Sequence, residues 1–107
     1  MATDPDFIAR LTYLAIEQGG RRTPAGTGHR PHTRFDGAND LVTIEQVFAE
    51  EKEFILPGES LEAEMTVIAK ERFTGKLYAG LTFEFFDGDK LIGSGTVLKV
   101  LNPKLQG

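Results

Sequence analysis

Strict alternation of apolar and polar side chains is the feature that most limits how this 107-residue chain can fold. From residue 60 to residue 70 nearly every second side chain is apolar, and those between are mostly glutamate, threonine or lysine. Because successive side chains of a strand point to opposite faces, this two-residue period predicts a half-buried β-strand. The same alternation returns at residues 78 to 86, so a second strand is predicted there.

The second alternating segment leads into a predicted hairpin. Asp87-Gly88-Asp89 offers the positive-φ chemistry of a tight turn, and a further strand is predicted from residue 90 to residue 101. Within that strand Gly93 and Gly95 lie on one face. Glycines inside a strand mark a close backbone approach or a bend of a barrel, so the last strand is predicted to be curved.

Two more strands are predicted upstream, at residues 7–16 and 41–48. For residues 7–16 a helix stays open as an alternative, since Phe7, Leu11 and Leu14 also fit one helical face. Residues 56–59, Leu-Pro-Gly-Glu, predict a turn. With a sixth strand to which no bounds are assigned, and with turns every 10 to 15 residues, the pattern indicates an all-β chain that folds as a small sandwich or a closed barrel. One core suffices for this length, so residues 1–107 are predicted to form a single domain.

Several functional classes are excluded or disfavoured by what the sequence lacks. Without cysteine there is no disulfide framework, thiolate metal site or cysteine nucleophile. No apolar run approaches the roughly 20 residues of a membrane span, and the N-terminus lacks a signal-peptide pattern, so a cytoplasmic location is expected. No phosphate-binding loop of the form Gly-x-x-x-x-Gly-Lys-Ser/Thr occurs, which excludes GTP hydrolysis. No cofactor, nucleotide or membrane partner is predicted.

Positive charge is concentrated in one segment of an acidic chain. The net charge is −4, which predicts repulsion from nucleic acid unless cations gather locally. Residues 21–34 hold four arginines, both histidines and no acid, whereas residues 45–59 are rich in glutamate and carry one lysine. The basic segment supplies most of the candidate partner-binding residues: Arg21, Arg22, Arg30, His32 and Arg34.

Two roles stay open for Arg21 and Arg30. Their planar guanidinium groups either brace the segment by bonding carbonyls and carboxylates, or contact a phosphate or carboxylate of a partner. Arg22 and Arg34 are expected to be solvated or to touch a partner.

Catalytic and metal-binding interpretations are weaker than structural ones. His29 and His32 lie in a segment that reads as extended, so they should point in different directions and no metal site is predicted. A hairpin turn explains residues 87–89 better than a calcium loop does. Ser94 lacks the strand-turn-helix context of a nucleophile elbow, and no acid-base pair predicts an enzyme.

Four motifs resemble the C-terminal β-barrel of elongation factor Tu. They are residues 19–24 (Gly-Gly-Arg-Arg-Thr-Pro), 28–31 (Gly-His-Arg-Pro), 56–59 (Leu-Pro-Gly-Glu) and 92–101 (Ile-Gly-Ser-Gly-Thr-Val-Leu-Lys-Val-Leu). They stand in the family's order and cover nearly the whole chain. The resemblance implies a closed or nearly closed antiparallel six-stranded barrel. In that family the barrel is the third of three domains; it packs on the GTPase domain, helps hold the T-stem of aminoacyl-tRNA and contacts the nucleotide exchange factor.

The family's tRNA contacts carry over only in part. Arg22 stands where the family has a contacting histidine, His32 where it has a glutamine, and Gly88 where a hairpin glycine makes a backbone contact. Gly88 therefore joins the candidate binding residues. The departures are Leu41 at a contacting threonine, Ala25 and Gly26 at two paired phenylalanines, and Lys70 or Glu71 at a basic position.

The resemblance and the basic segment together suggest a stand-alone binding module of the elongation factor Tu C-terminal type. It is expected to grip a protein or an RNA through the arginine-rich segment and the neighbouring strand edges. The alternative is a protein-only interaction module that acts as a mimic or decoy of elongation factor Tu.

Overall fold

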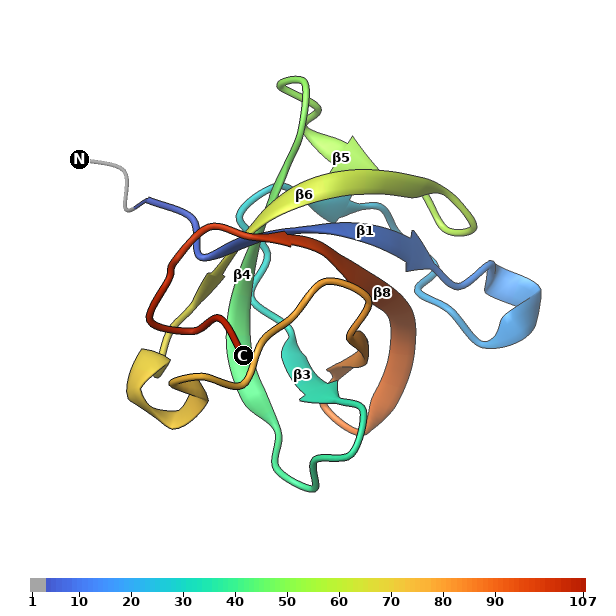
Figure 1. The fold of residues 1–107 in the computed structure, drawn as a ribbon. Coiled ribbons are helices and arrows are strands. Elements are labelled where there is room, and N and C mark those ends of the chain that lie inside the picture. The colour runs from blue at the N-terminus through green and yellow to red at the C-terminus, as the bar shows by residue number, and fades with distance from the viewer. Residues whose placement is uncertain (1–3) are drawn as a thin grey trace.

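A computed structural model describes residues 4–107 and contains a closed antiparallel β-barrel (Figure 1). Around the wall the strands follow the order β1 (Phe7–Tyr13), β6 (Ser60–Val67), β4 (Val42–Phe48), β3 (His32–Phe35), β7 (Thr82–Asp87) and β8 (Lys90–Val100). A small second sheet pairs β2 (Ala25–Gly26) with β5 (Phe54–Ile55), and η1 (Ile16–Gln18) and η2 (Lys70–Phe73) are short 3₁₀ helices. The predicted all-β class and six-stranded closed barrel are confirmed for the described part of the chain.

Strand β8 closes the barrel because it pairs with β7 along its first part and with β1 along its second. Two glycines allow it to bend there. A Cβ atom at Gly93 would lie 2.4 Å from Cζ of Phe85, and one at Gly95 would lie 2.4 Å from Cζ of Phe83. The two rings therefore rest directly on the β8 backbone, and the close approach predicted for these glycines is confirmed.

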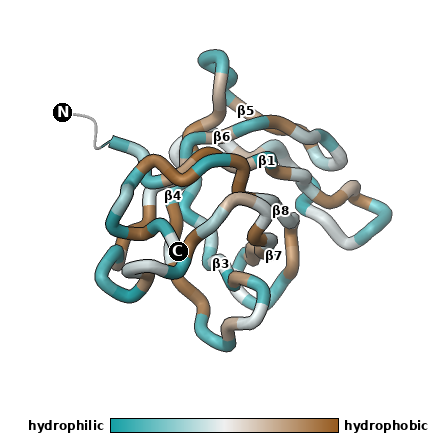
Figure 2. The backbone as a smooth tube through the Cα atoms, in the orientation of Figure 1, coloured by the Kyte–Doolittle hydropathy of each residue, from teal (hydrophilic) through white to brown (hydrophobic). Residues whose placement is uncertain are grey.

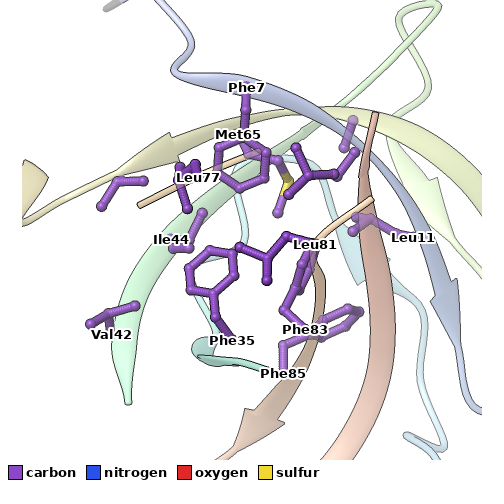
Figure 3. Packing of buried hydrophobic residues seen from close by; sticks show 14 of the residues in the cluster. Phe7, Leu11, Phe35, Val42, Ile44, Met65, Leu77, Leu81, Phe83 and Phe85 are labelled. Atoms are coloured by element: carbon purple, nitrogen blue, oxygen red, sulfur yellow. The ribbon is translucent and has the colours of Figure 1, made fainter. Parts of the chain in front are cut away.

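Aromatic side chains fill one part of the barrel interior. In Figure 3, Phe35, Phe83 and Phe85 lie together, while Phe7 and Met65 lie nearer the opposite side of the cluster. The rings of Phe35 and Phe83 meet edge to face, with centroids 5.5 Å apart. Such pairs add about 0.5–1.5 kcal/mol beyond the burial of their apolar surface. All five of these side chains are at most 5% exposed.

The C-terminal segment folds back against the barrel and covers part of its core (Figure 1). Leu105 and Leu77 are buried together, and the amide of Gly107 donates to the carbonyl of Leu77 at 2.6 Å. In Figure 2 hydrophilic residues colour most of the outer loops, whereas hydrophobic residues run along the strands. The apolar alternation seen in the sequence is thus used to fill a single core.

Asp6 joins three distant segments at the end of the β6 strand. Its carboxylate accepts hydrogen bonds from the amide of Val67 at 2.8 Å and from the side-chain amide of Asn102 at 3.0 Å, and it pairs with Nζ of Lys70 at 2.9 Å. The side chain of Asp6 takes the Val67 amide beyond Met65, the last β6 residue paired with β1, while the amide of Ile68 still donates to the carbonyl of Thr43 on β4 at 3.2 Å. The prediction of one strand over residues 60–70 was wrong beyond Val67, where the chain turns into η2.

The other predicted strands hold with adjusted ends. The strand predicted over residues 78–86 begins only at Thr82, because Gly80 takes a positive φ of 96° and residues 78–81 form a turn. The strand predicted over 7–16 is a strand, as favoured over a helix, and ends at Tyr13. The strands predicted over 41–48 and 90–101 are confirmed within one residue at each end, and residues 56–59 form the expected turn.

The predicted hairpin between β7 and β8 is also confirmed. Asp87 pairs with Lys90 across a two-residue loop, and Gly88 has a φ of 59°. A positive φ at the first loop residue is the requirement of a type II′ turn, and glycine meets it at no steric cost.

Adding a single methyl group at Gly95 should destabilise the barrel. We expect Gly95→Ala to lower the free energy of unfolding by about 1–3 kcal/mol, because the new Cβ collides with the Phe83 ring and with β8's neighbour β1. Urea unfolding measures this. Gly26→Ala is the control: its Cβ would meet nothing closer than 4.0 Å, so a change within about 0.5 kcal/mol is expected. Equal losses in both variants would contradict the role assigned to Gly95.

Candidate partner-binding surface

Three basic side chains line the outer face of the extended segment before and along β3. Arg30, His32 and Arg34 are exposed, and the residues between them are buried. Alternate residues of a strand lie about 7 Å apart on the same face. Strand geometry therefore brings together three of the candidate residues that the sequence predicted. They are called the basic stripe here.

Both arginines of the stripe are bonded to carboxylates on neighbouring strands. Nε and Nη2 of Arg30 lie 3.0 Å from Oε2 of Glu45 on β4, and Nη2 of Arg34 lies 3.0 Å from Oε1 of Glu84 on β7. The arginine side chains remain 62% and 45% exposed. Exposed ion pairs of this kind contribute about 0–1 kcal/mol, so a partner can compete for either guanidinium group.

A partly buried aromatic side chain lies beside the stripe. Phe86 on β7 stands opposite His32 in the strand register, and Cζ of Arg34 lies 5.3 Å from the centroid of its ring. A cation above an aromatic face is stabilised by about 0.5–1 kcal/mol at an exposed site. Sequence reasoning missed Phe86. The available signal was the pair Phe85-Phe86, because two adjacent phenylalanines in one strand cannot both face the core.

Arg21 and Gly88 both lie next to Asp87 at the β7–β8 hairpin, which follows Phe86, the residue that pairs with His32. Nη1 of Arg21 donates to Oδ2 of Asp87 at 2.7 Å, and its Nε donates to the carbonyl of Thr23 at 3.4 Å. With its side chain 24% exposed, Arg21 takes the bracing role of the two left open by the sequence. Gly88 is exposed in the turn that follows Asp87.

Arg22 lies exposed in the loop before β2, and within residues 4–107 it forms no ion pair. The structure therefore divides the candidate residues into three groups. The stripe residues share one face of β3, Arg21 and Gly88 belong to the hairpin, and Arg22 projects from the loop alone.

The sequence did not reveal a polar network that ties the loop at His29, within the basic segment of residues 21–34, to side chains of the barrel. The hydroxyl of Tyr13 donates to Oε1 of Gln46 at 2.5 Å and lies 3.3 Å from Nδ1 of His29, whose Nε2 is 3.7 Å from Oδ1 of Asp87. Gln46 is fully buried, and its Nε2 has no hydrogen-bond partner among the described residues. The loop is thus held by buried hydrogen bonds as well as by Arg21.

Burial shifts the pKa of both titratable groups in this network. It raises the pKa of the Tyr13 hydroxyl above its usual range, so the group stays a neutral donor. Burial, followed by the positive charge of Arg21, lowers the pKa of His29, while Asp87 opposes this shift. Neutral His29 is therefore the form that the fold favours.

The histidines do not form a metal site in the described part of the chain. His29 turns towards Tyr13 while His32 points outward from β3, as their extended segment predicted. Across residues 4–107, no three or more carboxylate or imidazole groups are arranged to hold a metal ion.

No helix within these residues has the length and apolar character to cross a membrane.

No model of a known protein family matches this chain.

The His29 network predicts that stability depends on pH. An unfolded chain holds His29 at an ordinary pKa of about 6.5, and the folded pKa is lower, so the unfolded state binds the proton first as pH falls. We expect the free energy of unfolding to decrease from pH 7.5 towards pH 5, and His29→Gln to flatten this slope. Urea titrations at several pH values measure it. His32→Gln, at an exposed position, is the control and should keep the wild-type slope.

Removal of the Tyr13 hydroxyl tests the buried bond itself. Tyr13→Phe leaves Oε1 of Gln46 without its donor in a buried site, which should cost about 1–3 kcal/mol of the free energy of unfolding. The exposed Tyr78→Phe should change it by less than about 0.5 kcal/mol. In the double variant Tyr13→Phe, Gln46→Leu much of the loss should return, because both polar partners are then gone. A double variant as unstable as the sum of the two single variants would count against the network.

Proposed function

We propose that this chain is a binding module without catalytic chemistry, which holds a partner protein on the basic stripe and Phe86. The observation that carries the proposal is that Glu45 and Glu84 already balance the charge of Arg30 and Arg34. Surfaces rich in arginine and aromatic side chains are typical of protein interfaces, and these need no excess positive charge.

Charge balance makes nucleic acid the less suitable partner. Binding to phosphates draws its free energy from cations that replace the counterions of the nucleic acid. Here each stripe arginine has a carboxylate 3.0 Å away, in a chain whose net charge is −4. A phosphate placed on Arg30 or Arg34 would therefore also approach a glutamate.

The motif resemblance supports the same kind of role. In elongation factor Tu the C-terminal barrel serves as a contact surface for its GTPase domain, the exchange factor and tRNA. A chain that resembles this barrel, and lacks the phosphate-binding loop, is suited to engage a protein of the translation machinery, including as a mimic or decoy of elongation factor Tu. Likeness of fold alone does not transfer function, so the stripe residues are the ones to test.

RNA is the second candidate, and one observation favours it. The guanidinium of Arg34 lies over the ring of Phe86, and His32 stands beside the same ring. Single-stranded RNA is commonly bound by such aromatic and cationic side chains, on which its bases stack. The salt dependence of binding separates the two candidates, because phosphate contacts weaken steeply as salt rises.

The stripe can be tested with two arginines in matched surroundings. Arg34 and Arg72 each pair with one carboxylate, at 3.0 and 2.9 Å, and their side chains are 45% and 47% exposed. We expect Arg34→Gln to weaken partner binding about tenfold, as loss of an arginine anchor does, and Arg72→Gln to change it less than twofold. The full chain is used to capture partners from lysate with and without nuclease treatment, and the recovered partner is titrated at 50 and 200 mM salt.

Three results would distinguish a protein partner on the stripe from RNA and from a binding surface elsewhere. A partner that survives nuclease, and loses affinity with Arg34→Gln alone, supports the proposal. Capture that disappears on nuclease treatment, together with a steep salt dependence, replaces the protein partner with RNA. Equal effects of Arg34→Gln and Arg72→Gln would show that the stripe is not the binding surface.

A further inference from the structure

Another part of the barrel wall is hollowed into a groove of about 520 Å³ over β1, β6 and β4. Apolar side chains contribute to its floor: Val47 on β4 is 37% exposed, and Ile8 on β1 is partly exposed. In the register of these strands Val47 and Ile8 both stand opposite Glu64, the β6 residue between them. The groove is centred on β6, two strands around the wall from β3 and the basic stripe.

The rim of the groove is acidic. Glu62 and Glu64 project from β6, while Glu50 and Glu51 come from the tight turn after β4. Within the described chain none of these four glutamates forms an ion pair, and the groove is lined by no lysine, arginine or histidine. Arg10 stands opposite Glu62 in the strand register and, with Lys52, lines the neighbouring hollow beside Glu50 and Glu62. Neither cation forms an ion pair with the four glutamates, so these carboxylates keep negative charge around the apolar floor.

The turn that carries two of these carboxylates has a defined shape. Glu50 and Glu51 both adopt positive φ, 59° and 57°, and the amide of Lys52 donates to the carbonyl of Ala49 at 3.2 Å. This is the backbone of a type I′ turn, which matches the twist of paired strands. The carboxylates are therefore placed at the end of β4 and next to the β6 glutamates.

We propose that this groove binds an extended segment of a partner protein in which lysine or arginine residues flank an apolar side chain. The apolar side chain would cover Val47 and Ile8, and the flanking cations would meet the glutamates of the rim. A single metal ion fits less well, because no three of the carboxylate or imidazole groups in residues 4–107 converge on one point. Opposite charges across an interface steer association and fix register, whereas the apolar contact supplies most of the affinity.

A short basic peptide tests this directly. The probe is a fluorescein-labelled hexapeptide, Lys-Arg-Leu-Val-Lys-Arg, titrated with the full chain at 50 mM salt and followed by fluorescence anisotropy. Glu62→Gln combined with Glu64→Gln should raise the dissociation constant about fivefold, the size expected when two rim charge pairs are lost. Val47→Thr, which keeps the side-chain shape and replaces one methyl group by a hydroxyl, should raise it about threefold.

The control changes the net charge equally without touching the groove. Glu17→Gln combined with Glu71→Gln removes two exposed carboxylates from η1 and η2 and should alter binding less than twofold. Arg34→Gln should also leave peptide binding unchanged, so failure of this proposal and failure of the stripe proposal are distinguishable. Urea midpoints verify that every variant is folded.

Amide chemical shifts locate the peptide. Shifts confined to residues of β1, β4, β6 and the turn after β4, with the variant effects above, would support the proposal. Equal weakening by the two glutamate double variants would mean unspecific charge attraction and would overturn it. It would likewise be overturned by shifts centred elsewhere, by no binding at millimolar peptide, or by Mg²⁺ or Ca²⁺ producing the groove shifts and displacing the peptide.

Discussion

The contact between two phenylalanine rings and the bare backbone of two glycines is the constraint on which the barrel depends. Phe83 and Phe85 occupy the space that side chains at positions 95 and 93 would need, so β8 can lie close to β7 and still curve round to β1. Closure leaves the main sheet without a free edge, so a partner strand cannot add to the barrel wall itself. The two surfaces proposed to bind partners, the basic stripe and the acidic groove, accordingly consist of outward side chains and a turn.

Local sequence predicted which side of each strand is buried, but not where every strand ends. Alternation in β6 assigned Ala63 and Met65 to the core, as found, because burial of one face repeats every two residues. At the end of β6 the amide of Val67 bonds to the carboxylate of Asp6, which lies 61 residues away in the sequence, and not to the backbone of a neighbouring strand. No pattern within the β6 segment contains that partner, so its length was overestimated.

The same distinction applies to the candidate site. The arginine-rich segment was visible as composition, but charge counts do not reveal that Glu45 and Glu84 stand beside Arg30 and Arg34, since this follows from the registers of three strands. Because of this pairing, the segment is not a concentration of unbalanced positive charge but a charge-balanced surface beside a partly exposed aromatic ring. The buried Tyr13 and Gln46 network was likewise hidden, because its members come from different strands.

The rigidity of the basic stripe and of the acidic groove bears on the affinity of the binding proposed for them. The loop that leads into the stripe is fixed at one end by Arg21 and Asp87 and at the other by the hydrogen bonds around Tyr13 and His29. Side chains that are already ordered lose less conformational entropy when a partner arrives, so the same contacts give a higher affinity than they would on a mobile loop. The glutamates of the acidic groove would also lose less conformational entropy on binding, since they stand on β6 or on a turn whose backbone is defined by two positive φ angles. Because one closed barrel carries both surfaces, their relative position is set by strand order and not by a flexible hinge.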